Sequence, residues 1–259
     1  MKSIYALFIG LGLMVFSSCS ENDPEPQFTT EFNQITSFSA DEVTVSLFAE
    51  EAFFVGYNTI QAKITDVDGN LLTGDIQVTP MMQMMDMRHS SPVELPGATF
   101  EDGSFSFHTV FVMPSGEMGQ WSLNFTINGT ELEVPVEVTA PELTRLASFT
   151  SLADETTRYF VAFLGPNDPQ VGQNDMEIAV YQRNSMMEWP AVTDVQFELE
   201  PWMVSMDHGS PNNIAPVHME DGHYIGKVNF TMTGDWQLRL TMSRDGEVCG
   251  SPYFDLFFQ

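Results

Sequence analysis

Methionine and histidine residues gather in two short segments whose side chains could bind a soft metal ion. The first segment holds Met82, Met85 and His89, and the second holds Met203, Met206 and His208. Thioether sulfur is soft and uncharged and imidazole is a borderline ligand, so together they suit Cu(I), whereas hard cations prefer oxygen. His218 and His223 follow the second segment and could close its site across a loop. These residues predict a Cu(I) site in each segment.

The spacing of these residues demands a bend in the chain. Met203 and Met206 are three residues apart, so a straight strand would point their side chains to opposite faces. Pro201 before them and Gly209-Ser210-Pro211 after them indicate a bend or loop that could let the ligands converge. The alternative is that these methionines pack over the edge of a hydrophobic core, because Met fills irregular gaps well.

The second half of the chain repeats the first. Pro80-x-Met82-x-x-Met85-Asp86 recurs as Pro201-x-Met203-x-x-Met206-Asp207, and His89-Ser90-Ser91-Pro92 recurs as His208-Gly209-Ser210-Pro211. Gly119-Gln120-Trp121 likewise recurs as Gly234-Asp235-Trp236. Self-similarity of this extent is typical of a tandem duplication. We predict one copy over residues 36–140 and the other over residues 143–259.

Each copy shows the alternation of a β-strand with one buried face. Apolar residues occupy every second position in two matching runs, namely Trp121, Leu123, Phe125 and Ile127, and Trp236, Leu238, Leu240 and Met242. Dipeptides such as Asn128-Gly129 and Asp245-Gly246 separate the runs and predict hairpin turns. The pattern predicts an all-β protein of two tandem immunoglobulin-like antiparallel β-sandwiches, each of about seven strands. By the same alternation, His108 is expected on an outward, solvated face.

The motif of the second copy resembles that of a known family. Pro201–Pro211 reads P-x-M-x-x-M-x-H-G-S-P, an aromatic residue follows sixteen positions after His208, and F-x-M-x-G-x-W ends at Trp236. These features resemble the YtkA-like/FixH-like family of secreted bacterial β-sandwich domains. The first copy is a looser match, with two residues inserted before His89. The resemblance implies periplasmic copper handling linked to cytochrome-oxidase assembly, and hence a copper-accepting envelope protein as partner.

The first residues read as a targeting segment. Lys2 precedes an apolar run at positions 4–16 that ends in Ser17-Ser18-Cys19. The run is shorter than the roughly 20 residues that span a bilayer. It resembles a bacterial lipoprotein signal, with residues 1–18 removed and Cys19 acylated; an ordinary cleaved signal is the alternative. Residues 19–35 would form a flexible acidic tether, and Ser20 in place of Asp favours sorting to the outer membrane.

Composition narrows the classes of function that remain. The chain has 9 basic and 36 acidic residues, a net charge of −27, so its surface repels phosphate backbones and we expect no nucleic-acid partner. Hydrophobic residues make up 43% of the chain, enough for buried cores. No phosphate-binding loop or nucleophile motif is present in the sequence, so we expect no enzyme. The alternative to copper binding is a structural or adhesive surface module without metal.

Overall fold

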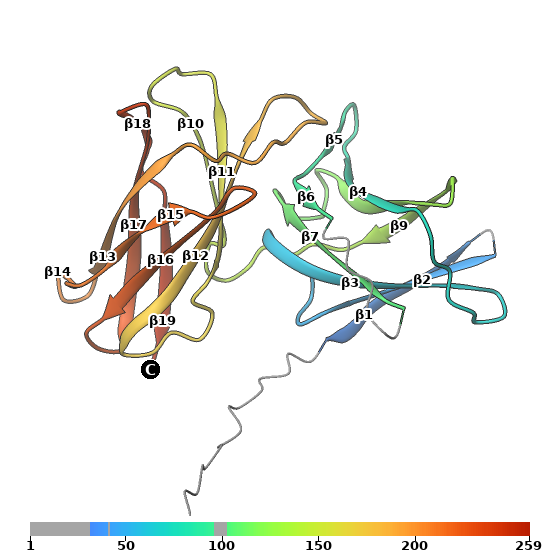
Figure 1. The fold of residues 1–259 in the computed structure, drawn as a ribbon, viewed down its shortest axis with the longest axis horizontal. Helices are drawn as coiled ribbons and strands as arrows, with labels where there is room; N and C mark the ends of the chain where they lie inside the picture. Colours follow the sequence, from blue (N-terminus) through green and yellow to red (C-terminus); the bar gives the residue numbers. More distant parts are fainter. Residues whose placement is uncertain (1–31, 41, 96–102) are drawn as a thin grey trace, which may run out of the picture. The chain divides into compact units, whose positions relative to one another are not determined.

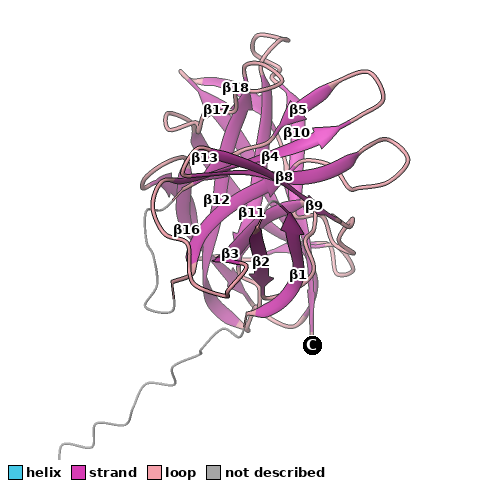
Figure 2. Cartoon of the chain, turned by 90° about the vertical axis from the view of Figure 1, so that its right-hand side faces the viewer, coloured by secondary structure: helices cyan, strands magenta, loops and turns pink. Residues whose placement is uncertain are grey.

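The computed structural model describes residues 32–40, 42–95 and 103–259. The predicted signal peptide and Cys19 lie outside these residues. Within them every regular element is a strand, as Figure 2 shows. No helix of the described residues is long and apolar enough to cross a membrane. The first strand begins at Asn33, inside the segment predicted as a tether.

The first sandwich contains nine strands among the described residues (Figure 1, blue to green). They are β1 (Asn33–Ala40), β2 (Val43–Ala49), β3 (Gly56–Asp66), β4 (Ile76–Gln83), β5 (Arg88–Ser90), β6 (Val93–Glu94), β7 (Phe105–Phe111), β8 (Gln120–Ile127) and β9 (Thr130–Val136). One sheet has the order β1-β2-β3-β7-β6 and the other has the order β5-β4-β8-β9. All of these strands pair antiparallel.

The second sandwich contains ten strands (Figure 1, yellow to red). They are β10 (Leu146–Thr150), β11 (Arg158–Gly165), β12 (Gly172–Arg183), β13 (Gln196–Met203), β14 (His208–Gly209), β15 (Ile214–His218), β16 (His223–Phe230), β17 (Gly234–Arg244), β18 (Glu247–Gly250) and β19 (Tyr253–Phe258). One sheet has the order β10-β11-β12-β16-β15, and the other has the order β14-β13-β17-β18, with β19 also paired to β17. The all-β, immunoglobulin-like prediction is confirmed, although short edge strands raise the number above seven.

The predicted alternation forms the two cores. Trp121 and Phe125 on β8 are 1% exposed, and Trp236 and Leu240 on β17 are equally buried. Each set packs against the facing sheet of its own sandwich, so the two sandwiches have separate cores. Burial of such side chains contributes about 1.5–3 kcal/mol each. The local alternation of the sequence therefore determines which face of each strand is inward.

In each sandwich the chain changes sheets just after the histidine of the repeated motif. In the first sandwich β5 pairs with β4 and β6 pairs with β7, with only Ser91 and Pro92 between them. Pro92 has no N–H to offer a ladder, while its carbonyl accepts hydrogen bonds from Val110 N at 3.0 Å and Thr109 Oγ1 at 2.9 Å. In the second sandwich β14 pairs with β13 and β15 pairs with β16. The repeated His-x-Ser-Pro motif therefore has a structural role as a crossing between sheets.

Candidate functional site

Both copies of the motif form a hairpin that sets a histidine opposite a methionine. In the first hairpin, β4–β5, Met82 pairs with His89; in the second hairpin, β13–β14, Met203 pairs with His208. Residues directly opposite in an antiparallel pair project to the same face. The structure thus brings together one methionine and one histidine of each predicted metal site.

A buried indole lies behind each of these pairs. His89 meets Trp121 edge-on with ring centroids 5.5 Å apart, and His208 meets Trp236 in the same way at 5.7 Å. Each indole Nε1 donates to a methionine carbonyl, from Trp121 to Met113 at 2.8 Å and from Trp236 to Met232 at 3.0 Å. The two hairpins therefore share one local design.

Hydrogen bonding orients each imidazole in a way that suits a metal ligand. His208 Nδ1 lies 2.9 Å from the carbonyl oxygen of Gly209, and His89 Nδ1 lies 2.8 Å from that of Ser90. A carbonyl only accepts, so in the neutral tautomer that this hydrogen bond selects the proton is on Nδ1 and the lone pair is on Nε2. Metal-binding histidines ordinarily donate their other N–H to such an acceptor. Both Nε2 atoms are thus set up as potential ligands.

The strand methionines lie in the cores. Met82 is fully buried and Met203 is 3% exposed. The end of each side chain occupies the space above a glycine: a Cβ on Gly119 would lie 2.6 Å from Met82 Sδ, and a Cβ on Gly234 would collide with Met203 Cε. Gly234 also has φ +134°, a conformation that side chains disfavour. Packing accounts for both of these methionines without a metal.

The turn methionines are exposed at the rims of the hairpins. Met85 is 90% exposed and Met206 is 57% exposed. In the first hairpin the turn is closed by a 2.9 Å hydrogen bond from Met84 N to Met87 O. In each predicted set of ligands, therefore, one thioether sulfur lies in the core and the other lies in the turn. At the second rim, Met206 and the half-buried His208 are two residues apart.

The structure corrects the expectation that His218 or His223 completes the second site. His208 contacts Trp236, which packs on Phe230 at the end of β16, with ring centroids 5.4 Å apart. His223 begins β16, and His218 pairs with Tyr224 one residue further along. The two ends of β16 are seven residue steps apart, which is roughly 23 Å at about 3.3 Å per residue. Neither histidine lies within reach of His208.

A loop of the second sandwich covers the first hairpin. Residues 184–189, here called the capping loop, form the first part of the connection from β12 to β13. Ser90 N donates to the carbonyl of Met186 at 2.8 Å, and the Trp189 ring lies 6.3 Å from that of His89. His89 is accordingly 7% exposed. On the second hairpin, by contrast, Val204 and Met206 are more than half exposed.

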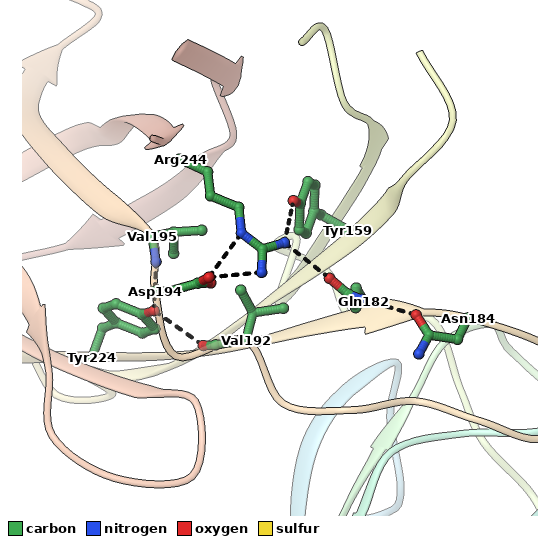
Figure 3. A network of polar contacts seen from close by, with 8 residues as sticks. All are labelled: Tyr159, Gln182, Asn184, Val192, Asp194, Val195, Tyr224 and Arg244. Atoms are coloured by element: carbon green, nitrogen blue, oxygen red, sulfur yellow. Dashed lines mark hydrogen bonds and ion pairs between the residues drawn. The ribbon is translucent and has the colours of Figure 1, made fainter. Parts of the chain in front are cut away.

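A polar network holds the base of the capping loop, as Figure 3 shows. The guanidinium of Arg244 donates to Asp194 Oδ2 from Nε at 3.0 Å and from Nη2 at 2.8 Å, and Nη1 reaches Tyr159 and Gln182. Gln182 Nε2 then donates to Asn184 Oδ1 at 2.8 Å. The hydrogen bonds to Asp194, followed by that to Tyr159, raise the pKa of Arg244 above its usual value. The connection from β12 to β13 is therefore fixed where it leaves the sheet.

A second polar group joins the two sandwiches. We call Tyr57, Glu94, Glu177, Tyr181 and His223 the junction cluster. Glu94 of β6 accepts hydrogen bonds from Tyr57 at 2.7 Å, from Tyr181 and from His223 Nε2 at 3.1 Å, and His223 Nδ1 lies 2.7 Å from Glu177 Oε1. A small apolar cluster that includes Val110 and Ala179 accompanies it. One carboxylate of the first sandwich thus binds two side chains of the second.

The charges in the junction cluster reinforce one another. Hydrogen bonds to Glu177 and then to Glu94 raise the pKa of His223 to about 10, so the imidazole is protonated at neutral pH. Burial pushes the pKa of Glu94 upward, but hydrogen bonds from His223, Tyr181 and Tyr57 outweigh it and leave that pKa below its usual value. Burial and then the charge of Glu94 raise the pKa of both tyrosines. The cluster therefore contains an ion pair between His223 and the carboxylates of Glu94 and Glu177. The two tyrosines that donate to Glu94 are neutral.

Sequence reasoning missed this cluster and misplaced His108. His108 is half-buried, stacks on Tyr57 with centroids 5.2 Å apart and has Nδ1 3.0 Å from Thr59 Oγ1, rather than being solvated. Burial lowers its pKa. The side chains of the junction cluster come from β3, β6, β12 and β16, and no local pattern connects them. A cleft of about 710 Å³ adjoins the cluster and is walled in part by Trp189 and Met219.

Among the described residues, no group of three or more His, Cys, Asp or Glu side chains could hold a metal ion. The second rim supplies one thioether from Met206 and one imidazole nitrogen from His208, with Met203 beneath them. This donor set fits Cu(I) and not a hard cation.

Comparison with known proteins identifies one domain. Residues 154–241 match the family profile described as YtkA-like, so the second sandwich contains a YtkA-like domain. This match includes the second hairpin and not the first. No curated protein matches the chain.

Solved structures with similar folds include proteins of bacterial surfaces. Domains 5–6 of the S-layer protein SbsC are 13% identical over 88% of this chain and 98% of that one, with a TM-score of 0.32. The Escherichia coli adhesin FdeC is 15% identical over 86% of this chain and 65% of that one, with a TM-score of 0.29. Chimeric titin Z1Z2 is 11% identical over 80% of this chain and 91% of that one, with a TM-score of 0.21.

Proposed function

We propose that this protein is a lipid-anchored Cu(I)-binding module of the cell envelope, with its copper site at the rim of the second hairpin. The observation that carries the proposal is the hydrogen bond from His208 Nδ1–H to the Gly209 carbonyl at 2.9 Å. It leaves the Nε2 lone pair on a residue that is paired with Met203 across the hairpin and is two positions from the exposed Met206. The YtkA-like match over residues 154–241 lies in the second sandwich and supports placing the proposed site there. We assign the protein a binding role and no catalytic one.

The ligands divide into accessible and supporting groups. His208 Nε2 and Met206 Sδ would bind the ion first, because their residues are at the exposed rim. Met203 would join only by turning its buried sulfur outward from the core. A site formed by one or two exposed donors would exchange its ion readily, which suits delivery to a copper-accepting envelope protein.

Titration of Cu(I) against a competing chelator under reducing, oxygen-free conditions tests the proposal. We expect one Cu(I) per chain, because the capping loop buries His89 in the first hairpin. His208→Ala and Met206→Leu should each weaken binding at least tenfold, since each removes one of few donors. Met203→Leu, which keeps the side-chain volume, should lower stability by less than about 1.5 kcal/mol.

The matched control is His218→Ala. His218 is an exposed histidine of the same sandwich at the far end of its strands, so its loss should leave copper affinity unchanged. Retention of full affinity by His208→Ala, or equal loss in His218→Ala, would rule out the second rim as the site.

A second candidate function is that of a rigid surface spacer. The junction cluster favours it, because hydrogen bonds and an ion pair fix one sandwich to the other. The two roles are compatible, since an envelope spacer could carry a copper site at one end. We further propose that Cys19 is acylated and holds the protein at the outer membrane, on the strength of the basic, apolar and Ser-Ser-Cys order of the first residues.

A further inference from the structure

The duplication places the same hairpin in two different surroundings. In the first sandwich the edge strand β5 is covered by the capping loop through the 2.8 Å hydrogen bond from Ser90 N to Met186 O. Gly209 of β14 is the counterpart of Ser90, because Met81 pairs with Ser90 just as Trp202 pairs with Gly209. The covered edge therefore shows what kind of segment this hairpin accepts.

Register fixes the direction of the backbone donor on the second edge. In an antiparallel ladder, residues alternate between bonding to the paired strand and pointing their N–H away from it. Ser90 N points away from β4, since it donates to Met186. The same register in the second hairpin points the Gly209 N–H away from β13, along an open edge strand. Exposed Val204 and Met206 border this edge.

We propose that the second hairpin is a docking edge for a loop of another protein that resembles the capping loop. Such a loop would present a backbone carbonyl to Gly209 N–H and an aromatic ring, three residues later, to His208, as Met186 and Trp189 do for the first hairpin. A second copy of this chain is a poor occupant, because its own capping loop is already engaged and its net charge of −27 opposes self-association.

The shape of the capping loop matters to the probe that tests this proposal. Asn184 N donates to Glu188 O at 3.0 Å, and Gln182 N donates to Pro190 O at 3.0 Å, so the loop is a closed turn. A linear peptide would lose binding energy in adopting this turn. The probe is therefore a peptide with the sequence of residues 182–190, flanked by two added cysteines and cyclised through their disulfide, which is added to the full chain in copper-free buffer with a chelator present. These conditions keep the outcome separate from that of the copper proposal.

Amide and imidazole NMR signals report where the peptide binds. We expect saturable shifts at Gly209, at His208 and at the Trp236 indole. A peptide carrying Trp189→Ala should bind at least fivefold more weakly, and Gly209→Pro in the protein should have the same effect because it removes the N–H. Absence of shifts on the second hairpin, shifts confined to β4–β5, or unchanged binding by Gly209→Pro would overturn the proposal.

Gly209→Ser provides a variant with the opposite expected sign. It restores the residue of the first copy, where Ser90 Oγ also lies 3.4 Å from Met186 O. The added Cβ would lie 3.2 Å from Pro201 O, a close approach that a small shift of the edge strand relieves. We expect the peptide to bind this variant as tightly as the wild type or up to fivefold more tightly. Weaker binding, with the Trp236 indole signal unchanged in the free protein, would contradict the docking edge even if Gly209→Pro fails to fold.

Discussion

At the scale of single residues, two histidines of one sandwich have opposite electrostatic roles. His208 donates from Nδ1 to a neutral carbonyl and keeps a lone pair on Nε2. His223 donates from both nitrogens to carboxylates, Glu177 and Glu94, and is held as a cation. A cationic imidazole cannot ligate a metal. These hydrogen bonds therefore place His223 in the junction cluster and leave His208 as the potential metal ligand.

The raised pKa of His223 predicts how stability depends on pH. Its pKa is about 10 in the folded protein against an ordinary value of 6.5, so its contribution is complete below pH 6.5 and is lost as the pH rises through 10. The lowered pKa of Glu94 makes its contribution present above 4.5 and lost as the pH falls through the folded value. Urea unfolding from pH 6 to 10.5 should show the free energy of unfolding fall towards the alkaline end.

His223→Gln separates this effect from other alkaline titrations. We expect the variant to be about 2 kcal/mol less stable at pH 7, because it loses hydrogen bonds to charged partners. It should also show a smaller fall in stability between pH 7 and 10.5 than the wild type. Parallel pH profiles for the two proteins would contradict the assigned role of His223.

At the scale of elements, each hairpin depends on a glycine at the start of the strand that pairs with it. Gly119 precedes β8, and Gly234 begins β17. Gly234 has φ +134°, and a Cβ there would collide with Met203 Cε. The glycine lets the methionine fill the space beneath the hairpin and brings Trp236 behind His208. The geometry of the second rim therefore depends on Gly234, although this glycine has no side chain that could bind a metal.

Gly234→Ala should destabilise the protein through both strain and a clash. Gly246→Ala is the matched control, because Gly246 also has a positive φ, of 84°, but has nothing within 4 Å of an added Cβ. We expect Gly234→Ala to cost about 1–3 kcal/mol more than the control in chemical denaturation, the usual cost of overpacking a core. Equal losses would show that Met203 is free to move and that only the backbone conformation matters.

At the scale of the whole molecule, the two sandwiches carry the same motif but leave only one copy open. The capping loop of the second sandwich buries His89 of the first, while His208 remains half-buried at an uncovered edge. The unequal contact uses the first hairpin in assembly, and the proposed binding role falls to the second hairpin, which stays uncovered. The junction cluster secures this arrangement by joining Glu94 to Tyr181 and His223.

The proposed anchor is a property of the whole molecule as well. Metabolic labelling with a radioactive fatty acid should mark the wild-type protein, and Cys19→Ala should abolish both the label and retention in the membrane fraction. Cys249→Ala is the control, because that thiol is buried on β18 and should not be acylated. A label that persists in Cys19→Ala would exclude the lipid anchor at this position.

The amino-acid sequence by itself determined the strands, their buried faces and the repeat. Alternation of apolar and polar residues is a local signal, so Trp121, Phe125 and Trp236 could be placed in cores before any fold was known. The bend between Met203 and His208 could be predicted from Pro201 and Gly209. The register that pairs these two residues could not. The expected convergence of His218 on the same point was wrong, because residue spacing carries no information on which end of a strand a loop meets.

Only the tertiary structure decided what covers the outward faces. Tyr57, Val110 and Tyr181 lie on outward faces of their own sandwiches; where the sandwiches meet, Val110 and Tyr181 are buried and Tyr57 is half-buried. Glu94 and His223 are 129 positions apart, and their hydrogen bond depends on contact between two sandwiches that have separate cores. Local patterning sets which side of a strand is apolar, whereas contacts between units depend on the complementarity of whole surfaces, and that complementarity exists only after both cores have formed.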